Sequence, residues 1–211
     1  MLHSELISGS TSGSRRLMVV LHGLGDSVEG FRWLPEALRL PELNYLLVNA
    51  PDEYYGGYSW FDLQGDVVAG VKRSRALLFA LLDDLRAQGF PTGLTTLGGF
   101  SQGCLMTMEA GLRYPHRFAG LVGISGWVCG SKQVLQELSP VAREQRFLVT
   151  HGTLDPVVAI EQTRPQIAAL QAAGLRLAWR EFRKAHTIAG EEELTVIRDF
   201  VRAGYGDVVG A

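Results

Sequence analysis

The sequence predicts an α/β fold in which a mostly parallel β-sheet is covered by helices on both faces. Segments with strand character alternate with helical segments about six times along the 211 residues. The run from Leu17 to Leu21 is apolar without interruption, which is typical of a strand buried on both faces of a parallel sheet. There is no internal repeat and no break in composition, so we expect residues 1–211 to form a single domain.

Seven segments have the character of strands. They cover residues 2–7, 16–22, 44–49, 94–99, 118–124, 146–150 and 176–182. The first is expected to be an edge strand. Ligands bind such sheets beyond the carboxyl ends of the strands, so the loops that leave those ends are where chemistry is expected.

Helices are expected between these strands, and proline or glycine follows the ends of most of them. They cover residues 28–40, 66–88, 104–112, 131–138, a segment that ends at 173, and 191–203. Asp66 can cap the second helix. Two starts remain open for the helix that ends at residue 173. Either Thr163 and Gln166 form a capping box with Pro165 in the first turn, or the helix starts at Val158 and Pro165 kinks it. Residues 51–64 are expected to be a long loop.

Composition and charge exclude several classes of function. A net charge of −2 gives no basic surface for nucleic acid. We find no signal peptide and no apolar stretch long enough to span a membrane, so we expect no stable membrane insertion and a cytoplasmic location. The two cysteines, Cys104 and Cys129, are expected to be reduced core residues. No cluster of Cys or His has metal-ligand spacing and no phosphate-binding loop occurs, so we expect neither metal nor cofactor.

The stretch Gly99-Phe100-Ser101-Gln102-Gly103 contains the pattern Gly-x-Ser-x-Gly between a predicted strand and a predicted helix. A serine hydroxyl becomes a nucleophile when a sharp turn exposes it and a base removes its proton. Glycines two residues before and after the serine remove the Cβ atoms that would clash in such a turn. The pattern therefore predicts Ser101 as a catalytic nucleophile; the alternative is a glycine-rich turn that contains a serine by chance.

The partners of such a serine follow it in the order Asp or Glu, then His. Asp155 lies in the loop after the strand at residues 146–150, and His186 lies in the loop after the next strand. The two loops can therefore be neighbours. Of the five histidines, only His186 follows both Ser101 and Asp155 and lies in a strand-to-helix loop. The alternatives are a solvated histidine and an aspartate that caps the helix after Pro156.

Developing negative charge on the attacked carbonyl needs hydrogen-bond donors that are already in place. We expect the backbone N–H of Gln102 to be one and that of Leu24, in the His22-Gly23-Leu24-Gly25 loop, to be the other. Trp60 and Trp127 lie in aromatic stretches at the same rim. They are expected either to contact substrate or to pack against the end of the sheet. No insertion is long enough for a lid domain, so the site should be an open groove.

Six motifs occur in order over nearly the whole chain. They are Leu21-His22-Gly23-Leu24-Gly25-Asp26, Ser59-Trp60-Phe61-Asp62, Gly98-Gly99-Phe100-Ser101-Gln102-Gly103, Ser125-Gly126-Trp127, His151-Gly152-Thr153-Leu154-Asp155-Pro156-Val157-Val158 and the loop of His186. Together they resemble the phospholipase/carboxylesterase family, the acyl-protein thioesterase-like serine esterases of the α/β-hydrolase fold.

The resemblance implies a Ser101-Asp155-His186 triad with Leu24 and Gln102 as oxyanion donors. It also implies hydrolysis of small-molecule or lipid carboxylic esters without a cofactor. Thioesters of acylated proteins and lysophospholipids are alternative substrates, and a homodimer is a further expectation. A rival hypothesis is a non-catalytic protein of the same fold that binds an apolar ligand or a partner.

The sequence departs from the family pattern at three places. The loop before Trp60 is rich in Tyr and Gly where the family often has Met and Pro, and two further departures lie beside Ser101 and His186. Cys104 stands where the family usually has a second glycine after Ser-Gln-Gly, and the run Arg183-Lys184-Ala185 precedes His186 where the family usually has a glycine. These departures leave the triad intact but bear on substrate preference.

Overall fold

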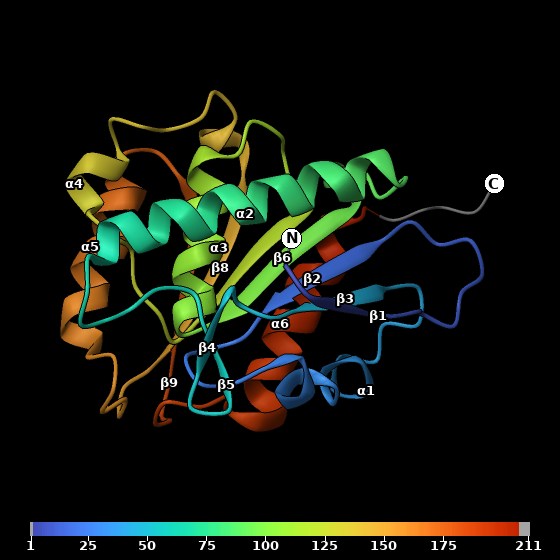
Figure 1. The fold of residues 1–211 in the computed structure, drawn as a ribbon, viewed down its shortest axis with the longest axis horizontal. Helices are drawn as coiled ribbons and strands as arrows, with labels where there is room; N and C mark the ends of the chain where they lie inside the picture. Colours follow the sequence, from blue (N-terminus) through green and yellow to red (C-terminus); the bar gives the residue numbers. More distant parts are fainter. Residues whose placement is uncertain (1, 207–211) are drawn as a thin grey trace.

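The computed structural model describes residues 2–206, and its central feature is a seven-stranded sheet (Figure 1). The strand order is β1-β3-β2-β6-β7-β8-β9. The strands are β1 (Ser4–Ile7), β2 (Leu17–Leu21), β3 (Asn44–Val48), β6 (Thr95–Phe100), β7 (Gly120–Ile124), β8 (Arg146–Gly152) and β9 (Arg176–Phe182). Only the edge strand β1 runs antiparallel to its neighbour, so the predicted edge strand and the mostly parallel sheet are confirmed.

Helices cover both faces of this sheet, as predicted. The helix α2 (Val67–Ala87) crosses in front of the strands in Figure 1, and α6 (Gly190–Gly204) lies behind them. One core joins the sheet to α2, α3 (Gln102–Arg113) and α5 (Ile160–Ala172), and a second joins its other face to α1 (Leu34–Leu38) and α6. The inner strands are apolar on both sides because each side faces a core.

Parallel pairing brings the carboxyl ends of the strands to one edge of the sheet. In the register, Leu21 of β2 lies beside Gly99 of β6, and Phe100 lies beside Ile124 of β7. Strand β8 pairs with β9 up to Gly152. The loops of Leu24, Ser101, Asp155 and His186 therefore leave the sheet along the same edge.

Two segments of the first half differ from the sequence prediction. The helix expected over 28–40 is divided into a 3₁₀ turn, Val28–Phe31, and the short helix α1, which begins beside Pro35. Proline has no N–H to continue an existing helix, but it fits the first turn of a new one. The expected loop over 51–64 contains a small hairpin of β4 (Asp52–Tyr54) and β5 (Gly57–Ser59).

The hairpin was missed because it depends on two turn residues with positive φ. Tyr55 has φ 46° and Gly56 has φ 88°, the left-handed geometry that joins two short antiparallel strands. Tyrosine seldom adopts this conformation, so the Tyr-Gly pair is a weak hairpin signal.

Of the two starts left open for α5, the structure shows the one near Val158, and the capping box of Thr163 and Gln166 does not form. The helix begins at Ile160, with Pro165 inside it, and Ala159 at its N-cap provides no side-chain hydrogen bond. The Thr163 hydroxyl instead donates to the carbonyl oxygen of Gly126 (3.1 Å). Thr163 therefore connects α5 to the loop that follows β7.

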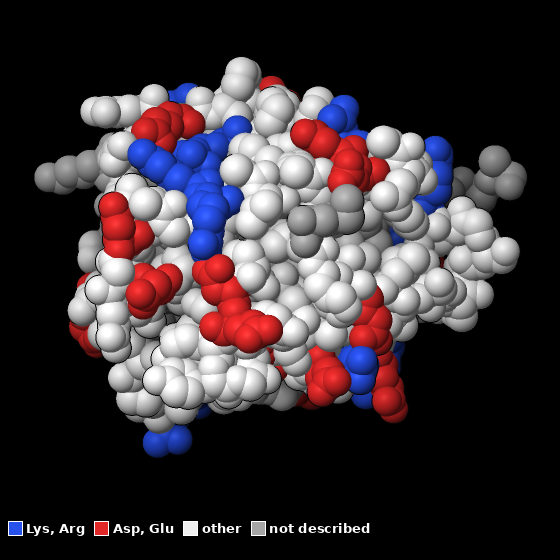
Figure 2. Space-filling model, viewed as in Figure 1, with Lys and Arg blue, Asp and Glu red and all other residues white. Residues whose placement is uncertain are grey.

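The connection from β7 to β8 contains little regular secondary structure. It holds α4 (Ser131–Val134) and a 3₁₀ turn, Ala142–Glu144, where the sequence predicted a helix over 131–138. Within residues 2–206, no helix combines the length and the apolar character needed to cross a bilayer. On the face seen in Figure 2, acidic and basic side chains lie side by side among uncharged residues.

Candidate active site

Ser101 lies in a strained turn between β6 and α3. Its backbone has φ 54° and ψ −115°, a conformation that L-residues rarely adopt. A Cβ at Gly99 would collide with the Gly103 carbonyl, and a Cβ at Gly103 would collide with the Leu21 carbonyl. The two glycines therefore permit the close approach of strand and helix, for the reason given from the sequence.

The surroundings of this turn hold it in place. The Ser101 N–H donates to the Ile124 carbonyl of β7 (2.9 Å), and the Ser101 carbonyl accepts from the N–H of Leu105 (3.2 Å). The helix α3 is buried on all sides from Gln102 to Leu112, as predicted from its apolar sequence. Packing of this helix compensates for the strain at the serine.

His186 connects Ser101 to Asp155. The distance from Ser101 Oγ to His186 Nε2 is 3.0 Å, and that from His186 Nδ1 to Asp155 Oδ2 is 2.8 Å. The three side chains come from loops after β6, β8 and β9. Because Asp155 accepts from Nδ1–H, the neutral imidazole presents its basic Nε2 to the serine hydroxyl.

Asp155 is held as an anion. Burial alone raises the pKa of its carboxyl group, but hydrogen bonds from the Val158 N–H, His186 and the Val157 N–H outweigh burial, so that the net pKa is lowered. Both backbone N–H groups donate to Oδ1 at 2.9 Å, which leaves Oδ2 for the histidine. The residue thus also caps the turn after Pro156, so the alternative structural role exists beside the contact with His186.

His151 is close to Asp155 but does not reach the serine. Its side chain is fully buried, and its Nε2 lies 2.9 Å from the Val158 carbonyl. Burial lowers the pKa of His151, which keeps the ring neutral. The ring stacks on Trp179 with centroids 5.7 Å apart. The histidine ring that lies at Ser101 is thus that of His186 and not that of His151.

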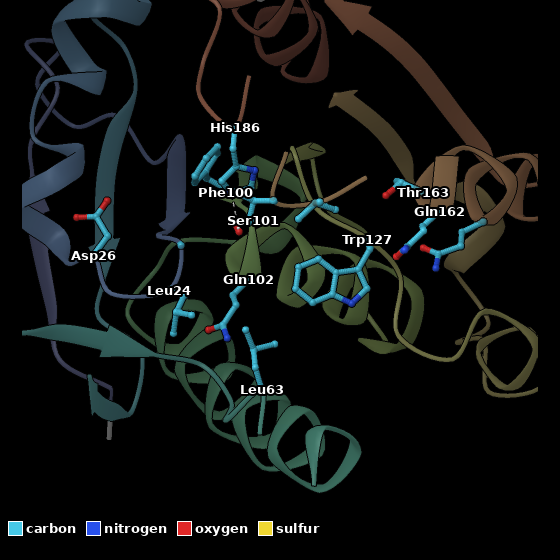
Figure 3. Close-up of a pocket in the computed structure, with 14 residues that line it drawn as sticks. Leu24, Asp26, Leu63, Phe100, Ser101, Gln102, Trp127, Gln162, Thr163 and His186 are labelled. Carbon is cyan, nitrogen blue, oxygen red and sulfur yellow. Dashed lines mark hydrogen bonds between the residues drawn. The ribbon is translucent and has the colours of Figure 1, made fainter. Parts of the chain in front are cut away.

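Leu24 and Gln102 both border the space above Ser101 (Figure 3). Neither backbone N–H donates to an acceptor within residues 2–206, so both are free to receive an anionic oxygen. The Leu24 loop can approach because Gly23 lacks a side chain: a Cβ there would lie 3.2 Å from Ser101 Cβ. Gly25 has φ 78°, which turns the chain away after Leu24.

The side chain of Gln102 has a structural role that the sequence did not reveal. Its Oε1 accepts from the N–H of Trp60 (2.9 Å), and its Nε2 donates to the Phe61 carbonyl (2.9 Å). These bonds fasten the segment after β5 to the serine turn. The sequence does not indicate these bonds, because the partners of the glutamine side chain are backbone atoms remote in sequence.

The expectation that Trp60 contacts substrate is corrected by its burial. Its side chain has no exposed surface, and its indole Nε1 donates to the His22 carbonyl (2.9 Å). Trp60 therefore packs beneath the Leu24 loop, the alternative considered from the sequence. Trp127, by contrast, is partly exposed and lines the pocket with Ser101.

The pocket is an open groove with a volume of about 500 Å³. In Figure 3, Leu24 and Leu63 lie below Ser101, Trp127, Thr163 and Gln162 lie to its right, and His186 lies directly above it. The sequence analysis missed several of the lining residues: Asp26, Leu63, Phe100, Val157, Val158, Gln162, Thr163 and Gln166. Leu63 and Val157 are exposed apolar residues, with 52% and 68% of their surface accessible. Val157 lies two residues after Asp155, and this proximity to a predicted site residue was a sequence signal that it lines the pocket.

Cys104 is buried behind the serine turn. Its Sγ occupies space that is available because Gly123 and Gly126 lack side chains; a Cβ at either would lie 2.7 Å from the sulfur. Burial raises the pKa of its thiol to about 12. Cys104 is thus a packing residue, as expected. Among the residues described, no group of three or more His, Cys, Asp or Glu side chains could hold a metal ion.

A family model and several curated relatives match this chain. The model of the phospholipase/carboxylesterase family matches residues 3–204. Acyl-protein thioesterase 1 of Schizosaccharomyces pombe is 34% identical over 74% of this chain and 75% of its own. A probable carboxylesterase of Oryza sativa subsp. japonica is 27% identical over 93% of this chain and 80% of its own.

Solved structures show the same relationship. The crystal structure of esterase PE8 superimposes with a TM-score of 0.86 and 29% identity, over 96% of this chain and 98% of that chain. That of Zea mays acyl-protein thioesterase 2 has a TM-score of 0.78 and 25% identity, over 97% of this chain and 99% of that chain. The predicted α/β-hydrolase fold is confirmed, and the chain belongs to the phospholipase/carboxylesterase family.

Proposed function

We propose that this member of the family hydrolyses carboxylic esters through an acyl-enzyme on Ser101. The observation that carries the proposal is the continuous hydrogen-bonded chain from Ser101 through His186 to Asp155. Such an arrangement supplies a nucleophile, a base that faces it and a carboxylate that orients the base. A family of ester hydrolases and an open pocket at the serine support the same function.

In the first half of the reaction, Ser101 Oγ attacks the ester carbonyl while His186 Nε2 takes its proton. The carbonyl oxygen becomes an anion, which the N–H groups of Leu24 and Gln102 receive. His186 then gives the proton to the departing alcohol, and the acyl group remains on Ser101. In the second half, water attacks the acyl-enzyme with His186 again as base, and the acid is released.

The substrate is proposed from the pocket and the relatives. Leu63, Trp127, Val157 and Val158 provide apolar surface for an acyl chain, and the open groove admits a large group on the other side of the ester. The Schizosaccharomyces pombe relative is named a thioesterase of acylated proteins, so a protein thioester is the second candidate substrate. Lysophospholipids and a homodimer stay predictions from the sequence resemblance, and a cytoplasmic location stays a prediction from the sequence itself.

The test of the mechanism is the Ser101→Ala variant, assayed with p-nitrophenyl esters. Loss of the nucleophile should lower kcat by about a million-fold if the three residues act as a unit. A loss of less than about tenfold would contradict the proposal. A fluorophosphonate probe separates the non-catalytic alternative, because a protein that only binds a ligand would leave Ser101 unlabelled.

The two candidate substrate classes are compared directly. Oxygen esters and thioesters of equal acyl length should be hydrolysed side by side, with kcat/KM measured for each. A higher value for the oxygen ester supports the carboxylesterase, and a higher value for the thioester supports the second candidate. A series of acyl lengths then shows how much of the apolar groove the substrate occupies.

A further inference from the structure

A buried ion pair lies at the base of the His186 loop. Lys184 Nζ donates to both carboxylate oxygens of Glu193, at 2.6 and 2.7 Å. The side chains of Lys184 and Glu193 are 3% and 0% exposed. Lys184 precedes His186 by two residues, and Glu193 lies in the first turns of α6. The pair therefore connects the start of the loop to the helix that follows it.

Glu193 also holds the other end of the same loop. Its Oε2 accepts from the N–H of Ala189, the residue at the N-cap of α6, at 2.6 Å. Alanine has no side chain that could cap the helix, so Glu193 supplies the acceptor from inside the helix. The loop that carries His186 is thus fastened to one carboxylate on both sides, at Lys184 and at Ala189.

The backbone of Lys184 reaches the loop of Asp155. Its carbonyl accepts from the N–H of Leu154 at 3.1 Å, one residue before the carboxylate that binds His186. A Cβ at Gly152 would collide with this carbonyl and lie 3.0 Å from Lys184 Cγ, so the glycine makes room for the lysine. Lys184, in the His186 loop, therefore contacts both the Asp155 loop and α6.

Stability alone does not account for this pair. Taking two charges out of water costs free energy that their attraction often fails to exceed, and apolar replacements are frequently neutral or stabilising. Burial lowers the pKa of Lys184, although the attraction of Glu193 opposes this shift. A charge pair that costs desolvation and joins the loops of two site residues indicates a role in geometry.

We propose that Lys184 and Glu193 are positioning residues, which hold His186 within hydrogen-bond distance of both Ser101 and Asp155. The inference rests on the proposed esterase function. Neither side chain lines the pocket, so the pair acts through the histidine and does not contact substrate. A catalytic group displaced by about 1 Å can cost a hundredfold in rate, so a modest relaxation of this loop is enough to matter.

The experiment is a neutral double variant, Lys184→Met/Glu193→Gln. It removes both charges together, leaves no unpaired buried ion, and keeps an amide oxygen that can accept from the Ala189 N–H. We expect a melting temperature close to that of the wild type, a kcat about 10- to 100-fold lower and a KM within about twofold, because orientation of the base matters in the transition state. The rate of fluorophosphonate labelling at Ser101 should fall by a similar factor.

Glu109→Gln is the matched control. Glu109 is also buried and pairs with Arg75 (2.9 Å) and Arg113 (2.8 Å), but it lies on α3 away from the His186 loop. This variant should lose stability and keep the kcat of the wild type per folded molecule. A folded double variant with wild-type kcat and labelling rate would overturn the positioning role. If the double variant does not fold, Glu193→Gln alone is measured, and an unchanged kcat in that variant also overturns it.

The wild type separates the two proposals. A wild type that neither hydrolyses esters nor reacts with the probe contradicts the esterase function. A wild type that does both, beside a double variant that is equally active, contradicts only the positioning role of Lys184 and Glu193.

Discussion

At the scale of single residues, the position of Ser101 depends on neighbouring glycines that lack a Cβ atom. Ser101 borders the pocket in a strained conformation with positive φ because Gly99 and Gly103 carry no Cβ atoms. Gly23 also lacks a Cβ atom, which allows the Leu24 loop to contact the serine. The conformation of Ser101 therefore depends on its glycine neighbours, and a small change at one of them should lower the proposed activity.

Gly103→Ala tests this account of the turn. The new Cβ would collide with the carbonyls of Leu21 and His22, so helix and strand must separate. We expect a loss of about 1–3 kcal/mol in the free energy of unfolding, together with a large loss of kcat because Ser101 moves. Gly93→Ala, where nothing lies within 4 Å of the new Cβ, should stay within about 0.5 kcal/mol of the wild type. Equal effects of the two substitutions in denaturant titrations would contradict the account.

At the scale of elements, each site residue sits where a parallel strand gives way to a loop. The loop between β8 and α5 shows how such a segment orders itself. Asp155 accepts from two backbone N–H groups of its own turn and from His186 of the neighbouring loop. The same carboxylate thus stabilises the turn and orients His186, so the stability of the fold depends on the ionisation of a residue in the site.

This link predicts how stability depends on pH. The pKa of Asp155 is lowered in the folded protein from its ordinary value of 3.8, so its contribution is present above that value and is lost as the pH falls through the folded pKa. Relative to Asp155→Asn, the wild type should therefore lose its stability advantage below about pH 4. Urea titrations of both proteins between about pH 3 and 7 measure this difference. A difference that stays constant over the range would show that the carboxylate is not selectively stabilised in the fold.

The contact of α3 with β7 predicts a coupling between two positions. Gly123→Ala would place a Cβ 2.7 Å from Cys104 Sγ, with its next neighbour, in Val149, at 3.5 Å. The substitution should cost about 1–3 kcal/mol in the wild type and much less in a Cys104→Gly background. Unfolding free energies of the four proteins give the coupling energy, expected at about 0.5–3 kcal/mol. Additive effects would mean that the cysteine does not fill this space.

At the scale of the molecule, the parallel sheet is what brings the site together. Ser101, Asp155 and His186 are separated by long stretches of chain, yet β6, β7, β8 and β9 are consecutive in the sheet and end at one edge. Helices on both faces bury the strands and leave that edge to the loops. The serine turn is indicated by local sequence, whereas the meeting of His186 and Asp155 with Ser101 needs the topology.

This division explains what the sequence could and could not predict. Apolar runs and glycine spacing indicated the strands, the serine turn and the order of the three site residues, because those signals are local or follow the chain order. The burial of Trp60, the side-chain bonds of Gln102 and the Lys184–Glu193 pair depend on contacts between remote segments. The hairpin at Tyr55 depends on a positive φ angle at a non-glycine residue, which composition does not indicate.

The proposed function requires that the convergence of three loops makes a single hydroxyl reactive. The most direct measurement is mass spectrometry of the protein quenched in acid during turnover of a p-nitrophenyl ester. The account predicts one acyl group per chain, located on the peptide that contains Ser101 and missing in the His186→Ala variant at the same reaction time. Acyl groups on a different residue, or hydrolysis at full rate with Ser101 unmodified, would contradict it.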